Sequence, residues 1–160
     1  MALTVVLDAN IALAAALPLP YSPDERAVAM VALAAPDLWR YEVITGLRRA
    51  QWERIISDVE LERALALLED LDLELVHPSP ALNRVALDWA ARLEQNKAYD
   101  GHYLALAEHL GAQFWTADRR LANELRDRGV DWATGSASAE RCRRLDARVP
   151  WCAIARTPRA

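Results

Sequence analysis

Residues 98–121, AYDGHYLALAEHLGAQFWTADRRL, decide the fold of this chain, because they predict a helix, a tight turn and a buried strand in one continuous unit. The first half has leucine and alanine at helical spacing, which predicts a helix with one apolar face. Gly111 stands where helices commonly end in a left-handed residue. The short apolar run Gln113–Thr116 is typical of a strand with both faces covered. Asp100 at the start of the helix and Asp118 just past the strand can therefore lie at the same end of a sheet.

Short apolar runs and helical patterns alternate along the rest of the chain. This alternation favours an α/β fold in which a mainly parallel sheet has helices on both faces. Besides the strand at 113–116, strands are predicted at Leu3–Leu7, Leu73–Val76 and Val130–Trp132. Besides the helix at 98–110, helices are predicted at Asn10–Leu17, Pro23–Ala34, Leu38–Arg54, Asp58–Leu71, Pro80–Glu94 and Arg119–Arg128.

Length and composition favour one domain with its own core, since the chain has 160 residues and 53% of them are hydrophobic. No run of about 18 apolar residues is present, so no membrane-spanning helix is expected. The two cysteines, Cys142 and Cys152, lack the spacing of a zinc site or a disulfide framework, which fits a reducing, cytoplasmic setting. The N-terminal residues lack the basic start of a signal peptide.

The net charge of −4 is unevenly distributed. Residues 136–160 contain six arginines and only two acids, so residues 1–135 are clearly acidic. We expect a domain at 1–135 and a basic extension at 136–160 that packs on the same domain or is partly disordered. An acidic body is not typical of a non-specific nucleic-acid binder, but it allows a nuclease whose acids are screened by metal.

Four acids occupy positions that can converge. Asp8 ends the first predicted strand, Asp118 follows a later one, and Asp100 starts the helix between. Glu42 lies on a helix that can cover the same end of the sheet. Ligands bind beyond the carboxyl ends of parallel strands, and converging carboxylates without basic partners favour a divalent cation. Oxygen ligands suit Mg²⁺ or Mn²⁺, and such a cation supports phosphodiester hydrolysis.

Each of these acids also has a simpler interpretation when it is taken alone. Asp8, Asp100 and Asp118 all fit helix N-terminal positions, where a carboxylate caps backbone N–H groups or meets the helix dipole. Glu42 alone fits a solvated helix surface. The order and context of all four favour a shared site.

Three segments carry a resemblance to a known family. They are VVLDANI at 5–11, APDLWRYEVITGLRR at 35–49, and the stretch at 98–121. With these motifs the sequence resembles PIN-domain proteins, specifically the toxin ribonucleases of bacterial toxin–antitoxin pairs. The resemblance spans about Leu3 to Val130.

The resemblance implies a three-layer α/β/α sandwich that binds Mg²⁺ or Mn²⁺ and cleaves RNA. Asp8 and Asp100 would be the firmest metal ligands, and Asp118 a ligand directly or through water. Glu42 would complete the cluster and orient the attacking water. It further implies a small antitoxin partner and a homodimer. The implied groups that orient the acids by hydrogen bonds are Asn10 and Thr116.

One position departs from the family pattern. Some relatives carry a further acid two residues after the one that matches Asp118, and here that position is Arg120. Whether one or two metal ions bind is therefore open.

Aromatic and basic residues around Glu42 suggest a rim that contacts RNA. Packing against an antitoxin helix or a second protomer is an alternative role for the same residues. Other functions compatible with the acids are a DNA nuclease or phosphatase that uses the same site, and a non-catalytic module that binds RNA or protein. The rim residues are Trp39, Tyr41, Arg40, Arg48 and Arg49.

Overall fold

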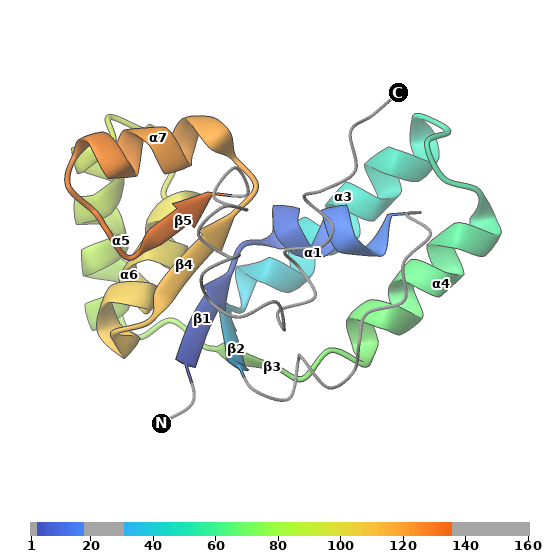
Figure 1. The fold of residues 1–160 in the computed structure, drawn as a ribbon, viewed down its shortest axis with the longest axis horizontal. Helices are drawn as coiled ribbons and strands as arrows, with labels where there is room; N and C mark the ends of the chain where they lie inside the picture. Colours follow the sequence, from blue (N-terminus) through green and yellow to red (C-terminus); the bar gives the residue numbers. More distant parts are fainter. Residues whose placement is uncertain (1–2, 18–30, 136–160) are drawn as a thin grey trace.

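The computed structural model describes residues 3–17 and 31–135, in which strands and helices alternate (Figure 1). The strands are β1 (Leu3–Leu7), β2 (Val31–Pro36), β3 (Leu73–Val76), β4 (Gln113–Thr116) and β5 (Ala133–Gly135). The helices are α1 (Ala9–Ala16), α3 (Leu38–Trp52), α4 (Asp58–Glu69), α5 (Pro80–Arg92), α6 (Tyr99–Leu110) and α7 (Arg119–Asp127).

All five described strands run parallel in the order β3–β2–β1–β4–β5. From β1 the chain moves outward to β2 and β3, and then returns through α5 and α6 to β4 on the other side of β1. Because crossovers between parallel strands are right-handed, this reversal puts α1, α3 and α4 on one face and α5, α6 and α7 on the other. Figure 1 shows these two groups of helices on either side of the sheet. The predicted α/β/α sandwich is confirmed.

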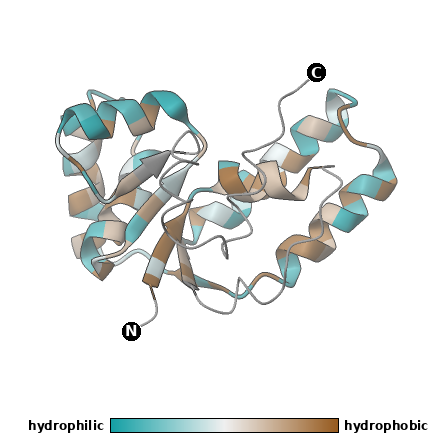
Figure 2. Ribbon diagram, in the orientation of Figure 1, coloured by the Kyte–Doolittle hydropathy of each residue, from teal (hydrophilic) through white to brown (hydrophobic). Residues whose placement is uncertain are grey.

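The reversal of strand order lies between β1 and β4, and this is where open parallel sheets bind ligands. The two strands are in register, with Leu7 beside Trp115. The core is built around them: Val5, Val6 and Phe114 have no exposed surface. Figure 2 shows hydrophobic residues along β1 and β2 and hydrophilic residues over α7. The residues that follow β1 and β4 therefore meet on a rigid, buried support.

One predicted helix is wrong. The predicted helix Pro23–Ala34 includes Val31–Ala34, but these residues form β2, between β1 and β3. Alanine-rich sequence favours a helix locally, whereas here Leu33, Ala34 and Ala35 are buried between layers on both faces of the sheet. Tertiary burial overrides the local preference. Residues 23–30 of the predicted helix lie outside the described residues.

The other predicted elements are close to the observed ones. The strands at 3–7, 73–76 and 113–116 have the predicted bounds, and Gly111 ends α6 with a φ of +58°. The predicted strand Val130–Trp132 is wrong in its position, because these residues end in a turn and the strand β5 follows directly at Ala133–Gly135. Within the described ranges, no helix is both long and apolar enough to cross a membrane. The expected basic extension at 136–160 lies outside these ranges.

Candidate active site

Asp8 lies immediately after β1, at the reversal of strand order. Its backbone N–H donates to the carbonyl of Trp115 on β4 at 2.9 Å, and its side chain caps α1 by accepting from the Asn10 N–H. The residue is only 8% exposed. Burial is the main cause that raises its pKa from 3.8 to about 6. Hydrogen bonds from Thr116 and Asn10 oppose this rise, and the charges of Glu42 and Asp100 add to it.

Asn10 and Thr116 hold the Asp8 carboxylate in one orientation. The Thr116 hydroxyl donates to Asp8 Oδ2 at 2.7 Å, and the Asn10 side-chain amide donates to the same oxygen at 2.8 Å. The amide also donates to Thr116 Oγ1 at 3.1 Å. The backbone N–H of Ala117 donates to Asn10 Oδ1 at 2.7 Å, which fixes the amide orientation. Two chain segments, residues 8–10 and residues 116–117, thus share one network.

Glu42 reaches the same region from α3. Its side chain is half-buried, and Oε2 accepts a 2.5 Å hydrogen bond from the Tyr103 hydroxyl of α6. Burial is the main cause that raises the Glu42 pKa, the Tyr103 hydrogen bond lowers it, and the charge of Asp100 raises it further. Glu42 therefore points into the molecule, and the solvated-surface interpretation is wrong.

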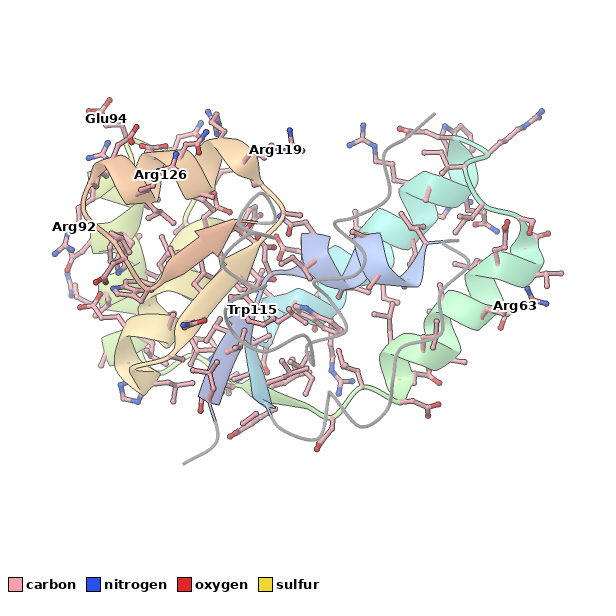
Figure 3. The ribbon with its side chains drawn as sticks, in the orientation of Figure 1. Arg63, Arg92, Glu94, Trp115, Arg119 and Arg126 are labelled. Carbon is pink, nitrogen blue, oxygen red and sulfur yellow. The ribbon has the colours of Figure 1, made fainter. Side chains whose placement is uncertain are left out.

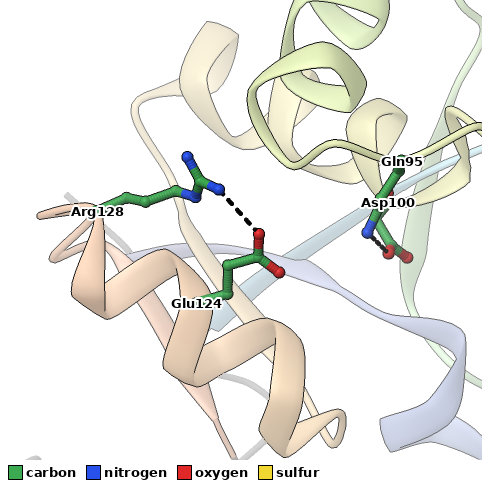
Figure 4. Close-up of polar contacts among 4 residues, drawn as sticks. All are labelled: Gln95, Asp100, Glu124 and Arg128. Carbon is green, nitrogen blue, oxygen red and sulfur yellow. Dashed lines mark hydrogen bonds and ion pairs between the residues drawn. The ribbon is translucent and has the colours of Figure 1, made fainter.

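Asp100 lies in the first turn of α6. Its Oδ2 accepts a 2.8 Å hydrogen bond from the side-chain amide of Gln95, in the loop before α6 (Figure 4). The same figure shows the ion pair between Arg128 and Glu124 on α7, which is separate from this contact. Gln95 thus holds Oδ2 of Asp100 and makes no hydrogen bond with Oδ1.

Asp8, Glu42 and Asp100 come from β1, α3 and α6, and their charges act on one another. None of the ion pairs formed by residues 3–17 and 31–135 includes any of the three. We refer to these three residues as the acidic cluster. A cluster of carboxylates without a basic partner has the donor chemistry that Mg²⁺ or Mn²⁺ prefers.

The arrangement of the donors limits how a cation fits. In the part of the chain that the structure describes, no three His, Cys, Asp or Glu side chains converge closely enough to hold one ion as they stand. Mg²⁺ commonly binds through one or two carboxylates and keeps several waters, so three convergent ligands are not required. The residues therefore fit such an ion by donor type, through one or two carboxylates and water.

Asp118 follows β4 and is the N-cap residue of α7. Its Oδ1 accepts from the backbone N–H groups of Arg120 and Leu121 at 2.8 and 3.1 Å, so it caps α7. Its own backbone N–H donates to Thr116 Oγ1 at 3.0 Å. Asp118 is thus joined to the network by its backbone, while its carboxylate is exposed at the start of α7.

Sequence reasoning missed two residues that touch the acidic cluster, Tyr103 and Gln95. Tyr103 could have been found, because it follows Asp100 by three residues and so shares its helix face. Gln95 carries no such signal, since it precedes α6 in a loop whose path the sequence does not define.

The predicted aromatic and basic rim on α3 is only partly accessible. Trp39 is 5% exposed and cannot stack on a base, so that part of the prediction is wrong. Its indole Nε1 has no hydrogen-bond partner among the described residues. Arg40, Arg48 and Arg49 are exposed.

The arginines near the C-terminal end of α3 already have neighbours. Arg48 lies over the exposed ring of Trp52, 5.4 Å from its centroid, and Arg49 pairs with Glu53 at 2.8 Å. Figure 3 places Trp115 in the middle of the molecule and Arg63, Arg92 and Arg126 at its periphery.

Comparison with known proteins agrees with this geometry. A chain from a toxin–antitoxin complex of Klebsiella pneumoniae has a TM-score of 0.50 and 12% identity, covering 81% of this chain and 95% of that chain. The crystal structure of PAE2754 from Pyrobaculum aerophilum has a TM-score of 0.59 and 21% identity, covering 86% and 94%. At these identities the likeness shows the fold alone. No curated protein matched. The family model of the PIN domain matches residues 5–124, three quarters of the chain, and the protein therefore belongs to the PIN domain family.

Proposed function

We propose that this protein is an Mg²⁺- or Mn²⁺-dependent endoribonuclease and the toxin of a toxin–antitoxin pair. PIN domains are generally nucleases that use divalent metal ions. The observation that carries the proposal is the acidic cluster: three carboxylates from separate parts of the chain lie within reach of one another's charge near the reversal of strand order, and none has a basic partner in the described residues. That is the place and the donor chemistry of a cation-dependent phosphodiesterase.

In this proposal Asp8 and Asp100 are the main ligands of the cation, and Asp118 is a ligand directly or through water. A bound cation supplies Lewis-acid stabilisation of phosphate charge and lowers the pKa of water. Asn10 and Thr116 keep the Asp8 carboxylate in a fixed orientation. Glu42, whose pKa is raised by burial, completes the set of metal ligands and orients the attacking water.

RNA is the proposed substrate, and the exposed arginines of α3 are its proposed contacts. Arg40, Arg48 and Arg49 are on the helix that carries Glu42, so phosphates along this helix would lead to the acidic cluster. Arginine at such a surface binds phosphates by charge and by paired hydrogen bonds. Substitution of each arginine tests its contact with RNA without changing the acidic cluster.

A protein partner is proposed for the same side of the molecule. Large apolar side chains are exposed along α3 and the start of α4, and such patches mark interaction sites. The neighbour from Klebsiella pneumoniae belongs to a toxin–antitoxin complex, which supports a small antitoxin as the partner. A homodimer through this face is also part of the proposal. The exposed residues are Tyr41, Ile44, Trp52, Ile55 and Val59.

The proposal is tested with purified protein, Mg²⁺ or Mn²⁺, and RNA and DNA oligomers of the same sequence. We expect cleavage of RNA that EDTA abolishes and that Asp8→Asn and Asp100→Asn reduce by several orders of magnitude. Glu62→Gln removes an exposed acid on α4 and is the matched control. Equal cleavage of both oligomers would favour a nuclease without RNA preference. Absence of both cation binding and cleavage would favour a non-catalytic binding module.

A further inference from the structure

Tyr103 connects the acidic cluster to the core of the protein. It lies on α6, three residues after Asp100, and is 2% exposed. Its ring packs against Phe114 of β4, with centroids 6.1 Å apart. From this fixed ring the hydroxyl donates to Glu42 Oε2 at 2.5 Å. A rigid side chain of one helix thus determines where a carboxylate of another helix lies.

The position of α6 is itself tightly set. A Cβ atom built on Gly101 would lie 2.3 Å from the backbone carbonyl oxygen of Ala86 on α5. The first turn of α6 therefore packs directly on the α5 backbone, and this contact places both Asp100 and Tyr103. Since backbone atoms cannot rotate away as a side chain does, the two residues have little freedom relative to α5.

The Tyr103 hydroxyl contacts the acidic cluster through Glu42, and its pKa also responds to the charge of Asp8. Burial, followed by its hydrogen bond with Glu42, raises its pKa well above the usual range, so it remains protonated and donates to the carboxylate. The charge of Asp8 also raises this pKa, and the backbone N–H of Ala9, next to Asp8, lowers it. The hydroxyl is therefore close to the segment of Asp8 as well as to Glu42.

We propose that Tyr103 is a positioning residue whose hydroxyl holds Glu42 beside Asp8 and Asp100, so that the cation affinity of the site depends on it. The inference rests on the proposed function, because it assumes that the acidic cluster binds a divalent cation. Tyr103 takes no part in the chemistry itself. It acts through the place and orientation of the Glu42 carboxylate, as groups behind metal ligands commonly do.

The test is a double-mutant cycle of Tyr103→Phe and Glu42→Ala in the full chain, with two measurements. Urea unfolding without metal shows whether the hydrogen bond exists in solution: the effects of the two substitutions on the unfolding equilibrium should not be independent. Calorimetry with Mn²⁺ then measures affinity. Tyr103→Phe should raise the Mn²⁺ Kd about 10- to 100-fold in the wild-type background, but leave it unchanged when Glu42 is alanine.

Tyr99→Phe is the matched control, because Tyr99 is on the same helix and is 57% exposed. It should leave the Mn²⁺ Kd unchanged. If Tyr103→Phe does not fold, replacement of Tyr103 by 4-aminophenylalanine keeps a weaker donor at the same place. That variant should give a Kd between those of the wild type and the Glu42→Ala variant.

The outcomes separate the two proposals. A wild-type protein that neither binds Mn²⁺ nor cleaves RNA overturns the proposed function, and the inference with it. A wild-type protein that does both, with an unchanged Kd in folded Tyr103→Phe, overturns only the role of Tyr103. An equal loss of affinity in both backgrounds also overturns it, since Tyr103 would then act without Glu42.

Discussion

The hydroxyl of Thr116 donates a 2.7 Å hydrogen bond to the carboxylate of Asp8, 108 residues away in the sequence. The hydroxyl also accepts hydrogen bonds from the Asn10 amide and from the backbone N–H of Asp118. One fully buried side chain therefore joins the residues that follow β1 to those that follow β4. The reversal of strand order creates the place for the site, and this hydroxyl connects its two sides.

Replacing Thr116 with valine keeps the shape of the side chain and removes the hydroxyl. Asp8 then loses a donor while it stays buried, and the Asn10 amide and the Asp118 N–H lose an acceptor. We expect the free energy of unfolding to fall by about 1–3 kcal/mol, measured by urea unfolding, together with slower RNA cleavage. Thr116→Ser keeps the hydroxyl and should lose much less. Equal losses in both variants would show that the methyl group, and not the hydrogen bond, matters.

The raised pKa of Asp8 predicts an unusual dependence of stability on pH. Its pKa is about 6 in the folded protein against 3.8 ordinarily, so the folded state binds the proton more tightly than the unfolded state. The stabilisation from this proton is fully present below about pH 4 and is lost as the pH rises to about 6. Two pKa units correspond to a loss of about 3 kcal/mol.

The measurement is urea unfolding from pH 4 to pH 8 in the presence of EDTA. Because other groups also titrate, the quantity to compare is the difference in unfolding free energy between wild type and Asp8→Asn, whose amide does not ionise. Relative to Asp8→Asn, the wild type should lose unfolding free energy as the pH rises from 4 to 6. Above pH 6 the difference between the two proteins should stay constant. A difference that does not change with pH would contradict the burial of a charged Asp8.

The sequence predicted those features of the fold that depend on local pattern. The run Gln113–Thr116 and the stop at Gly111 are set by residues within a few positions, and both were placed correctly. The segment Val31–Pro36 was not, because its alanines favour a helix while its burial between β1 and β3 decides the outcome. Burial between layers is a property of the complete sheet, which no local window contains.

In the site, too, the sequence predicts what depends on local position and does not predict what depends on packing. The sequence predicts a shared site for four acids, Asp8, Glu42, Asp100 and Asp118. The structure brings the charges of Asp8, Glu42 and Asp100 within reach of one another, and the Asp118 carboxylate caps α7. The bond between Tyr103 and Glu42 depends on how α6 and α3 approach the sheet from opposite faces. That approach follows from packing, such as Gly101 on α5, and the spacing of residues does not reveal it.

Gly101→Ala should destabilise the protein, because the new methyl group would lie 2.3 Å from a backbone oxygen of Ala86. Forced overpacking of this kind costs about 1–3 kcal/mol. Gly46→Ala is the matched control: its methyl group would also lie 2.3 Å from a neighbour, but that neighbour is the end of the flexible Leu13 side chain. Alanine is also the better helix former, so we expect Gly46→Ala to be close to neutral.

Thermal unfolding of both variants tests this prediction, and Mn²⁺ calorimetry extends it. Since Gly101 precedes Tyr103 and follows Asp100, a displaced α6 should also weaken cation binding in Gly101→Ala. If Gly46→Ala proved the more damaging of the two, the close approach of α6 to α5 would not be a determinant of the fold.

Two substitutions of Asp118 can distinguish its role as a helix cap from a role as a metal ligand. Its carboxylate caps α7 through the N–H groups of Arg120 and Leu121. Asparagine caps helices about as well as aspartate, so Asp118→Asn should leave the unfolding free energy almost unchanged, whereas Asp118→Ala should lower it by about 1 kcal/mol. If Asp118 also holds the cation, both variants should slow RNA cleavage about 10-fold or more, because both lack the charge. Cleavage at the wild-type rate by Asp118→Asn would restrict Asp118 to its role as a cap and leave the cation to the acidic cluster alone.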